Sequence, residues 1–413
     1  MAHVLFTAVN YWPEPSGNAP YTTALAERLA AAGHEVTVVT GFPHYPSWRV
    51  DGRYARRTRQ TETVAGVRIL RRRHFVPRHQ SVVTRGLYEA TFLFHGLASR
   101  PARADVVVGV VPSLGGAALA RLFAARWRAP YGVIVQDLMG PAAKQSGMPS
   151  GGRVAGAIAR LEGWTLARAR RVAIVSPSFD PYLRLIGVAP ERIVHLPNWA
   201  LHQPVSVDRA AARDRFGWAD EQVVLHAGNM GLKQGLEQII DAAELATVSA
   251  PQFRFVFLGD GNQRALLQRA AAHLANVQFL PSQPDEAYVA ALAAADVLIL
   301  SERPTVADMS LPSKLTAYCA AGRPIVAAVR EGGAAFLEIQ RAGAGLMVPA
   351  GNPEALLGAI ASLADDPALA ARLGAAGANY AETTLAASNG LERGRSFVEG
   401  LLVMPRRTRE AAA

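Results

Sequence analysis

Short strand-like runs alternate with helical patterns along this chain of 413 residues, and the alternation constrains its fold more than any other feature. The run Val4–Val9 leads into a helical pattern that stops at Gly33, and the β-branched run Glu35–Thr40 follows. A strand–helix–strand unit of this length predicts parallel strands joined by a right-handed crossover. The alternation starts afresh at Val223, after a polar connection over residues 202–220. We therefore predict an α/β protein with two doubly wound parallel sheets in series.

The length of the chain also favours two domains, because a single hydrophobic core stops growing at about 250–300 residues. We predict an N-terminal domain over residues 1–200 and a C-terminal domain over residues 201–385. A helix over residues 386–404 is expected to pack back toward the N-terminal domain, and a basic tail over residues 405–413 to be disordered. Ligands of open α/β sheets bind beyond the carboxyl ends of the strands. Two such domains are therefore expected to face each other across a cleft.

The composition limits the partners and the compartment. Lys and Arg number 43 against 33 Asp and Glu, and the net charge of +10 suits nucleic acid, an anionic membrane surface or phosphorylated small molecules. The single cysteine, Cys319, excludes an intramolecular disulfide and fits a reducing compartment. The N-terminus lacks a signal-peptide pattern, and the long apolar stretch over residues 106–120 is interrupted by Pro112 and Gly115. We expect a cytoplasmic protein without a membrane-spanning helix.

The segment from Arg71 to Leu97 is the most basic and most aromatic part of the chain. Its arginines precede or begin a helical pattern over residues 80–99, in which Phe92 and Phe94 are interleaved with aliphatic residues. Two interpretations remain open. The segment is either a solvated strand end followed by a core-facing helix, or a surface that contacts anionic head groups and inserts apolar side chains into the membrane interface.

A strand, a glycine turn and a helical pattern meet at residues 225–236, where the second domain opens. Free backbone N–H groups and the positive end of a helix dipole suit a phosphate there, and Lys233 adds a positive charge. An ordinary β–α turn that needs glycine for a positive φ explains the same residues. A second cationic helix start, Pro312-Ser313-Lys314, favours a diphosphate over a single phosphate. The residues expected to bind this phosphorylated ligand are Gly17, Asn229, Gly231, Lys233, Gly259, Gly261, Leu280, Ser282, Asp308, Ser310, Ser313 and Lys314.

Catalytic roles are assigned to Asp137, Lys233 and Lys314. Asp137 follows a predicted strand and could orient an acceptor hydroxyl; capping a helix is the alternative. No spaced set of Asp, His or Cys residues suits a divalent metal, so the two lysines and helix dipoles would stabilise a leaving diphosphate. A dinucleotide fold and a serine hydrolase are disfavoured, because neither Gly-x-Gly-x-x-Gly nor Gly-x-Ser-x-Gly occurs at the required place.

Several motifs in order resemble the retaining GT-B glycosyltransferases of family four, most of all the bacterial branch that builds capsule, O-antigen or colanic-acid-type polysaccharides. They are Tyr11-Trp12-Pro13-Glu14, Gly33-His34-Glu35-Val36, Pro197-Asn198, Lys233-Gln234-Gly235, Gly259-Asp260-Gly261, Pro312-Ser313-Lys314 and Ala321-Gly322-Arg323-Pro324. The resemblance implies the GT-B architecture, with a nucleotide-sugar donor held by the C-terminal domain and an acceptor by the N-terminal one. Lys233 matches the diphosphate lysine of the family.

The chain departs from the family at three places. Asn229 occupies the region of a usual arginine, so Lys314 would supply the missing positive charge. The paired glutamates fall on Met309 and Ala317, so Asp308, Ser310 and Ser313 would contact sugar and ribose, with Glu302 also nearby. Gln136-Asp137 occupies the region of a usual histidine.

The sequence thus predicts transfer of a sugar, with retention and without a metal, from a nucleoside diphosphate sugar to an acceptor hydroxyl. We expect a UDP-sugar as donor, no other cofactor and no nucleic-acid partner. The expected acceptor is a sugar or a polyprenyl-linked sugar, used in cell-surface polysaccharide biosynthesis at the inner face of the plasma membrane. A nucleotide-sugar epimerase of the same architecture and, less favoured, a basic nucleic-acid-binding protein are the alternatives.

Overall fold

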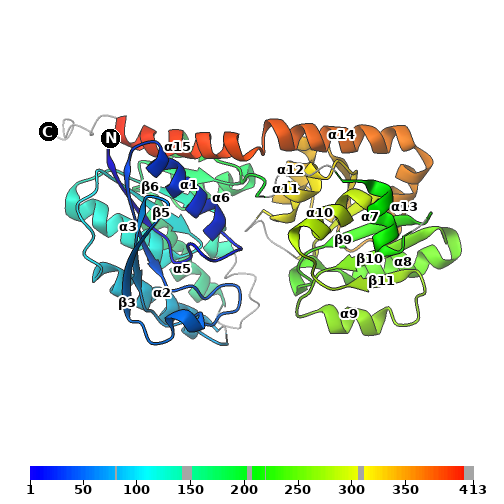
Figure 1. Cartoon of the computed structure of the whole chain (residues 1–413), viewed down its shortest axis with the longest axis horizontal. Helices are drawn as coiled ribbons and strands as arrows, with labels where there is room; N and C mark the ends of the chain where they lie inside the picture. Colours follow the sequence, from blue (N-terminus) through cyan, green and yellow to red (C-terminus); the bar gives the residue numbers. More distant parts are fainter. Residues whose placement is uncertain (80, 142–150, 202–206, 219, 306–310, 404–413) are drawn as a thin grey trace. The chain divides into compact units, whose positions relative to one another are not determined.

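The computed structural model describes residues 1–79, 81–141, 151–201, 207–218, 220–305 and 311–403, and the chain divides into two compact units (Figure 1). The first unit comprises Met1–Pro197 and the segment from Ser388 onward, and the second comprises Asn198–Ala387. The predicted tail over residues 405–413 lies outside the described residues. Each unit is an open α/β sheet covered by helices on both faces. No helix in the described ranges is both long and apolar enough to cross a membrane.

The first unit contains an eight-stranded sheet in the order β3-β4-β2-β1-β5-β6-β7-β8. The strands are β1 (His3–Thr7), β2 (Glu35–Gly41), β3 (Arg59–Val64), β4 (Val67–Arg72), β5 (Val106–Val111), β6 (Tyr131–Val135), β7 (Arg171–Ile174) and β8 (Ile193–His195). All neighbours pair in parallel except β3, which runs antiparallel to β4. The edge strand β3 was not predicted, because its polar residues lie at the rim of the sheet and carry no buried apolar pattern.

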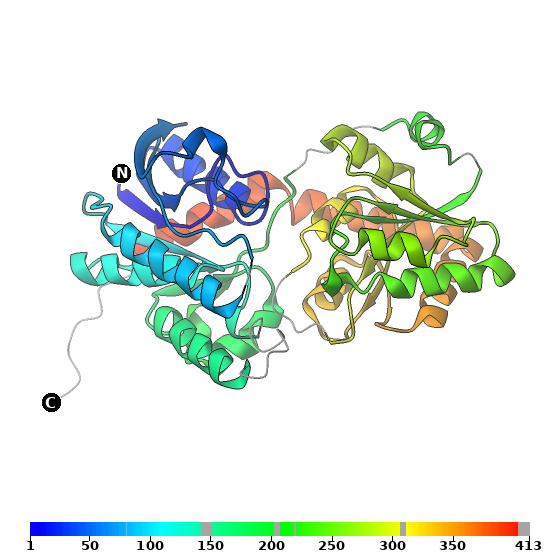
Figure 2. The same ribbon diagram turned by 90° about the horizontal axis from the view of Figure 1, so that it is seen from below.

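The helices of the first unit are α1 (Ala19–Ala31), α2 (Val82–Leu97), α3 (Leu114–Trp127), α5 (Gly151–Leu166), α6 (Asp180–Leu185) and α15 (Ala387–Val403). The last of these returns to the first unit: a side chain at Gly132 in β6 would meet Phe397 and Leu401, and one at Gly394 would meet Leu25 of α1. Figure 2 shows α15, in red, behind the sheet, with the blue-green helices α2, α3 and α5 in front of it. The helix α1 and the helix α15 therefore cover one face, and α2, α3 and α5 the other.

The second unit contains a six-stranded parallel sheet in the order β11-β10-β9-β12-β13-β14. The strands are β9 (Gln222–Ala227), β10 (Phe253–Leu258), β11 (Val277–Leu280), β12 (Val297–Ser301), β13 (Ile325–Val329) and β14 (Gly345–Pro349). Its helices are α7 (Arg209–Phe216), α8 (Glu237–Ser249), α9 (Arg264–Ala270), α10 (Asp285–Ala294), α11 (Lys314–Ala320), α12 (Ala334–Ala342), α13 (Pro353–Asp365) and α14 (Pro367–Thr383). Alternate residues of β10 enter two separate cores, because successive side chains of a strand point to opposite faces.

The helix α7 lies within the stretch that was predicted to be a connection. Asp208 caps its first turn by accepting bonds from the amides of Ala210 and Ala211, and Gly217 ends it in the left-handed conformation. Only Ala212 of the helix is buried, while Trp218 just beyond it is fully buried. A helix that docks through so few residues carries no clear hydrophobic period.

In each sheet, the chain first adds strands on one side of the first strand and then adds the later strands on its other side. In the first unit β1 lies between β2 and β5, and in the second β9 lies between β10 and β12. Loops that leave neighbouring strands in opposite directions leave a crevice at that point, where ligands of this fold class bind. The predicted stretch over residues 225–236 therefore lies at the switch point of the second sheet.

Candidate functional site

Two glycine turns of the second unit pack backbone against backbone at the carboxyl ends of β9 and β10. The amide of Gly228 donates to the carbonyl of Leu258 at 2.8 Å, and the amide of Met230 donates to that of Asp260 at 2.8 Å. A Cβ atom on Gly259 would lie 2.1 Å from the Gly228 oxygen, and φ is +138° there. Only glycine fits such an approach, so the predicted residues Gly259 and Gly261 build one continuous surface with the Gly228 turn.

Arg264, in the first turn of α9, fixes that surface to the next strand. Its guanidinium donates to the carbonyl oxygens of Gly259 and of Leu280, the latter at 2.9 Å. The amide of Gly259 also donates to Leu280, at 3.1 Å. Ser282, two residues further on, is exposed. Sequence reasoning missed Arg264, because an arginine at the start of a surface helix is ordinary until its acceptors are known.

Lys314 reaches the same turn from α11. Its Nζ atom lies 3.4 Å from Nε2 of His226 and 3.6 Å from the position of a Cβ atom on Gly228. No carboxylate of a described residue forms an ion pair with it. Burial lowers the pKa of Lys314 to about 7, against the opposing effect of Glu302. Burial, and then the positive charge of Lys314, lower the pKa of His226, so this imidazole is neutral at physiological pH.

Lys233 precedes the helix α8 and does not lie in its first turn. It belongs to a short 3₁₀ turn, Leu232–Gln234, and α8 begins only at Glu237, so the prediction that Lys233 opens this helix was wrong. The physical reason is Gly235, which adopts φ +53° and separates the two elements. The carbonyl of Lys233 accepts a bond from the amide of Arg303 at 3.0 Å, which ties the turn to the end of β12. The side chain of Lys233 is exposed.

The other predicted donor residues have different positions. Asn229 and Ser313 are exposed, and the Gly231 amide donates to Oε1 of Gln234 at 3.1 Å. Glu302, directly after β12, is partly buried; burial raises the pKa of its carboxyl, and Lys314 and Arg330 oppose that rise. Asp308 and Ser310 lie outside the described residues.

In the first unit, Tyr45 connects two predicted residues that are far apart in the sequence. Gly17 has φ +69°, and a Cβ atom there would lie 3.2 Å from the ring of Tyr45. Burial raises the pKa of the Tyr45 phenol, and the negative charges of Asp137 and Glu14 raise it further. Tyr45 was not predicted; its position between Pro43-His44 and Pro46, just after a strand, was the available signal. The amides of Met139 and Gly140, just beyond Asp137, donate to Glu162 at 2.9 and 3.0 Å.

The helix α2 is apolar on its outward face. Tyr88, Phe92 and Gly96 are buried, and the charged side chains of Arg85 and Glu89 are only 29% and 16% exposed. Glu89 accepts a bond from the amide of Gly115 at 2.8 Å, and Arg85 stacks over the ring of Tyr88 at 4.9 Å. The exposed residues Val83, Leu87, Ala90, Phe94 and Leu97, here named the α2 stripe, follow one another at intervals of three or four. The stripe therefore forms one continuous line along the helix.

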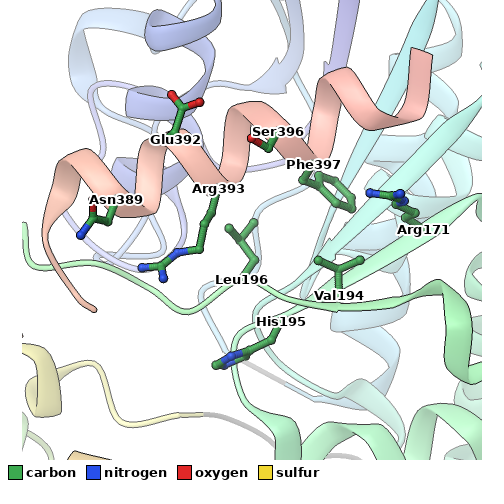
Figure 3. A pocket seen from close by; sticks show the side chains of 9 residues that line it. All are labelled: Arg171, Val194, His195, Leu196, Asn389, Glu392, Arg393, Ser396 and Phe397. Atoms are coloured by element: carbon green, nitrogen blue, oxygen red, sulfur yellow. The ribbon is translucent and has the colours of Figure 1, made fainter. Parts of the chain in front are cut away.

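Two cavities of about 410 Å³ each lie apart from the predicted residues. In Figure 3, Arg393 extends from α15 toward the loop of His195, and Arg171 of β7 lies beside Phe397. The other cavity, in the second unit, is lined by Pro304, Val329, Arg330, Glu331, Phe336, Met347, Val348, Pro349 and Ala350. Neither contains a residue that was predicted to bind donor or acceptor, so we place the candidate site at the glycine turns. In the described ranges, no three His, Cys, Asp or Glu residues gather in a way that could hold a metal ion.

Comparison with known families matches both units. The glycosyl transferase 4-like domain matches residues 16–199, and the glycosyl transferases group 1 family matches residues 208–380. A protein of Escherichia coli K12, named as a colanic acid biosynthesis glycosyl transferase, is 34% identical over 334 residues, which cover 77% of this chain and 81% of that protein.

Solved structures show the same fold. Sucrose-phosphate synthase from Thermosynechococcus elongatus superposes with a TM-score of 0.71 at 21% identity, over 97% of this chain and 99% of that one. The Anabaena protein HepE, solved in complex with UDP-glucose, gives 0.67 at 17% identity, over 97% and 100%. The architecture shared with these proteins is GT-B, as predicted.

Proposed function

Because the chain belongs to the family-four glycosyltransferases, we propose that it transfers a sugar residue from a nucleoside diphosphate sugar to an acceptor hydroxyl. One observation in the second unit carries this proposal. Lys314 lies partly buried against the Gly228 turn, with a neutral imidazole as its hydrogen-bond partner and no ion pair to a described carboxylate. A buried cation beside a glycine turn is stabilised by an anion that binds there. The diphosphate of the donor is that anion.

In this proposal the protein itself offsets the charge of the leaving diphosphate. Lys314 contacts it from within the turn, and the exposed Lys233 contacts it from outside. Preorganised cations and amides stabilise charge that develops in the transition state, and one such group is typically worth 10²–10³ in rate. We propose that transfer proceeds without a metal ion and with retention of configuration, as the resemblance to the retaining branch implies. The UDP-glucose complex of the Anabaena protein supports a UDP-sugar as donor.

We further propose that the acceptor is a lipid-linked sugar in the synthesis of a cell-surface polysaccharide. The name of the Escherichia coli relative, a colanic acid biosynthesis glycosyl transferase, supports the part of this proposal that concerns polysaccharide synthesis. The α2 stripe supports membrane association of the protein. Its exposed apolar side chains form a continuous line, and burying such a surface against a membrane is favourable. Arg78 before the stripe and Arg100 and Arg103 after it are exposed, and they suit anionic head groups. The protein would then act as a peripheral protein at the inner face of the plasma membrane.

Transfer is tested with purified full-length protein, UDP-, GDP- and dTDP-sugars, and lipid extracts or synthetic octyl glycosides as acceptors. The proposal expects a thermal shift with one class of nucleotide sugar and sugar transfer that depends on the acceptor. Conversion of the nucleotide sugar without any acceptor would indicate an epimerase instead. Nucleic-acid binding that weakens steeply with salt, together with no thermal shift by any nucleotide sugar, would indicate a nucleic-acid-binding protein.

Membrane association is tested by co-sedimentation with phosphatidylglycerol–phosphatidylcholine vesicles. The double variant Val83→Gln/Phe94→Gln removes the two most exposed side chains of the α2 stripe, 71% and 76% exposed, and should lose most vesicle binding. The control is Leu185→Gln/Val248→Gln, which changes apolar side chains elsewhere that are even more exposed, at 82% and 89%, and should bind as wild type. Equal vesicle binding by both double variants would contradict the proposal that the α2 stripe binds the membrane.

A further inference from the structure

The loop that follows β6 is held on both sides of Asp137. Before it, the amide of Gln136 donates to the carbonyl at the end of β5 at 3.2 Å. After it, the amides of Met139 and Gly140 donate to the two carboxylate oxygens of Glu162, at 2.9 and 3.0 Å. The backbone of Asp137 therefore lies between two fixed points.

Glu162, on α5, is a fully buried carboxylate whose partners are all donors. Its third partner is Tyr182 of α6, whose hydroxyl donates to Oε2 at 2.6 Å. Burial raises the pKa of the Glu162 carboxyl, and the bonds from Tyr182 and the two amides oppose that rise. An ionised carboxylate only accepts, so three donors favour the charged form that burial disfavours. Such charge-assisted bonds are roughly twice as strong as neutral ones, so Glu162 is a firm anchor for the loop.

Two glycines allow three elements to meet at this carboxylate. A Cβ atom on Gly140 would clash with the Tyr182 hydroxyl and would lie 3.2 Å from Oε2 of Glu162. A Cβ atom on Gly163 would lie 2.9 Å from the carbonyl oxygen of Ile186, just beyond α6. Only glycine lets the loop approach Tyr182, and α5 approach the end of α6, as closely as this. The junction is therefore tightly packed, and a change at Glu162 is transmitted to the loop.

The anchored loop carries Asp137 at the carboxyl end of β6, the side of an open α/β sheet where ligands bind. Asp137 is partly exposed, and its negative charge raises the pKa of the Tyr45 phenol. Glu162 itself has no exposed surface and cannot touch a substrate. Any effect of Glu162 on a reaction must therefore act through the loop.

We propose that Glu162 is a positioning residue for sugar transfer: by holding the backbone beyond Asp137, it fixes the place of the Asp137 carboxylate during the reaction. The inference rests on the proposed function and on the catalytic role predicted for Asp137. Glu162→Gln keeps the size of the side chain, but its amide group presents a donor to one of the backbone amides. The loop should shift, and a misplacement of about 1 Å can cost about 10² in rate.

The kinetic experiment compares full-length Glu162→Gln with the matched control Glu338→Gln. Glu162→Gln should lower kcat about 10- to 100-fold and leave the thermal shift by the nucleotide sugar unchanged. Glu338, only 3% exposed, accepts from the hydroxyl of Tyr380 at 2.7 Å in the second unit, so its variant changes a similarly buried carboxylate. Glu338→Gln should lower the melting temperature and keep the wild-type kcat. A wild-type kcat in Glu162→Gln, or an equal decline in both variants, would overturn the inference.

A double-mutant cycle shows whether Glu162 acts through Asp137. Asp137→Asn should itself lower kcat, and adding Glu162→Gln should lower it by less than about twofold more, because the group to be positioned is already lost. Penalties that multiply, or a wild-type kcat in Asp137→Asn, would contradict the positioning role. If Glu162→Gln does not fold, Gly140→Ala pushes the same loop away from Tyr182, and Gly156→Ala in α5, whose methyl group meets no atom within 4 Å, is its control.

Hydrogen exchange separates this inference from the proposed function, because it needs no turnover. The amides of Met139 and Gly140 should exchange about tenfold faster in Glu162→Gln than in the wild type, and at the wild-type rate in Glu338→Gln. Faster exchange in a protein that transfers no sugar would uphold the anchor and overturn the proposed reaction. Faster exchange with an unchanged kcat, or a lower kcat with unchanged exchange, would overturn the positioning role and leave the reaction standing. Unchanged exchange without transfer would overturn both.

Discussion

The switch points of the two sheets, here named the first and the second crevice, differ in chemical character. At the switch point of the second unit, glycine turns expose backbone amides, and Lys233 and Lys314 supply positive charge. At that of the first unit, Glu14 and Asp137 supply negative charge beside the aromatic rings of Tyr45 and Trp48. The chain contains only three lysines among its 43 basic residues, and two of them lie in the second crevice. The same architecture therefore presents one surface suited to phosphate and another suited to neutral hydroxyl groups.

The character of the second crevice depends most on Lys314, so its removal should have the largest effect. Lys314→Met should lower kcat/KM by about 10²–10³, because a preorganised charge beside the diphosphate is lost. The melting temperature should stay the same or rise, since a partly buried cation without an ion pair to a described carboxylate is replaced by an apolar chain. Steady-state transfer kinetics and calorimetry measure the two effects.

The exposed Lys233 provides the comparison for that variant. Lys233→Met should lower kcat/KM by only about tenfold, because a charge in contact with water is screened. If Lys233→Met proves as damaging as Lys314→Met, the leading role belongs to the outer lysine, and the burial of Lys314 is structural.

The close packing of the glycine turns distinguishes the second crevice from the first, and a substitution at Gly259 tests it. Gly259→Ala places a Cβ atom 2.1 Å from the Gly228 oxygen at a positive φ, so it should destabilise the second unit by about 2–3 kcal/mol and weaken nucleotide-sugar binding. Gly358→Ala in α13 is the control, because no atom lies within 4 Å of its new methyl group. That substitution should be neutral or stabilise by about 0.5–1 kcal/mol. Urea unfolding compares the two, and equal stability would refute the close packing of the turns.

Apolar patterns in the sequence predicted most strands and helices around both crevices. The side-chain contacts inside the crevices could be identified only from the structure. The strand-like runs Val4–Val9 and Glu35–Thr40 are observed, within one or two residues, as the strands β1 and β2, because buried β-branched strands have strong local patterns. The strand β3 and the helix α7 were missed, because each buries few side chains. The site residues Tyr45, His226 and Arg264 were also missed, since their partners lie on other elements and no local period indicates such a contact.

The first crevice should be sensitive to acid through His74. This side chain is buried beside His44 and Tyr88 with neither ring nitrogen bonded, and burial, with the nearby His44, lowers its pKa to about 3. The unfolded chain takes up a proton at this histidine below its ordinary pKa of about 6.5, whereas the folded chain does not. Stability should therefore be full above pH 6.5 and fall by about 1.4 kcal/mol per pH unit as the pH is lowered toward 3.

The variant His74→Leu removes that proton uptake. Its free energy of unfolding should decline less steeply between pH 6.5 and 5 than that of the wild type, by about 2 kcal/mol over the interval. Urea titrations at several pH values measure both slopes. Parallel curves for wild type and variant would show that His74 is already accessible to protons in the folded protein.

The second crevice should respond to alkali instead, with a smaller effect. Because the pKa of Lys314 is about 7, its ammonium loses a proton in the empty protein as the pH rises from 7 to 8, while a bound diphosphate favours the charged form. The dissociation constant of the nucleotide sugar should therefore increase with pH above 7, by at most about tenfold per unit. In Lys314→Met that dependence should vanish, and binding should be weak at every pH. Titration calorimetry across pH 6.5–8.5 compares the two proteins, and a wild-type affinity that stays constant over this range would mean that Lys314 keeps its proton in the crevice or does not meet the diphosphate.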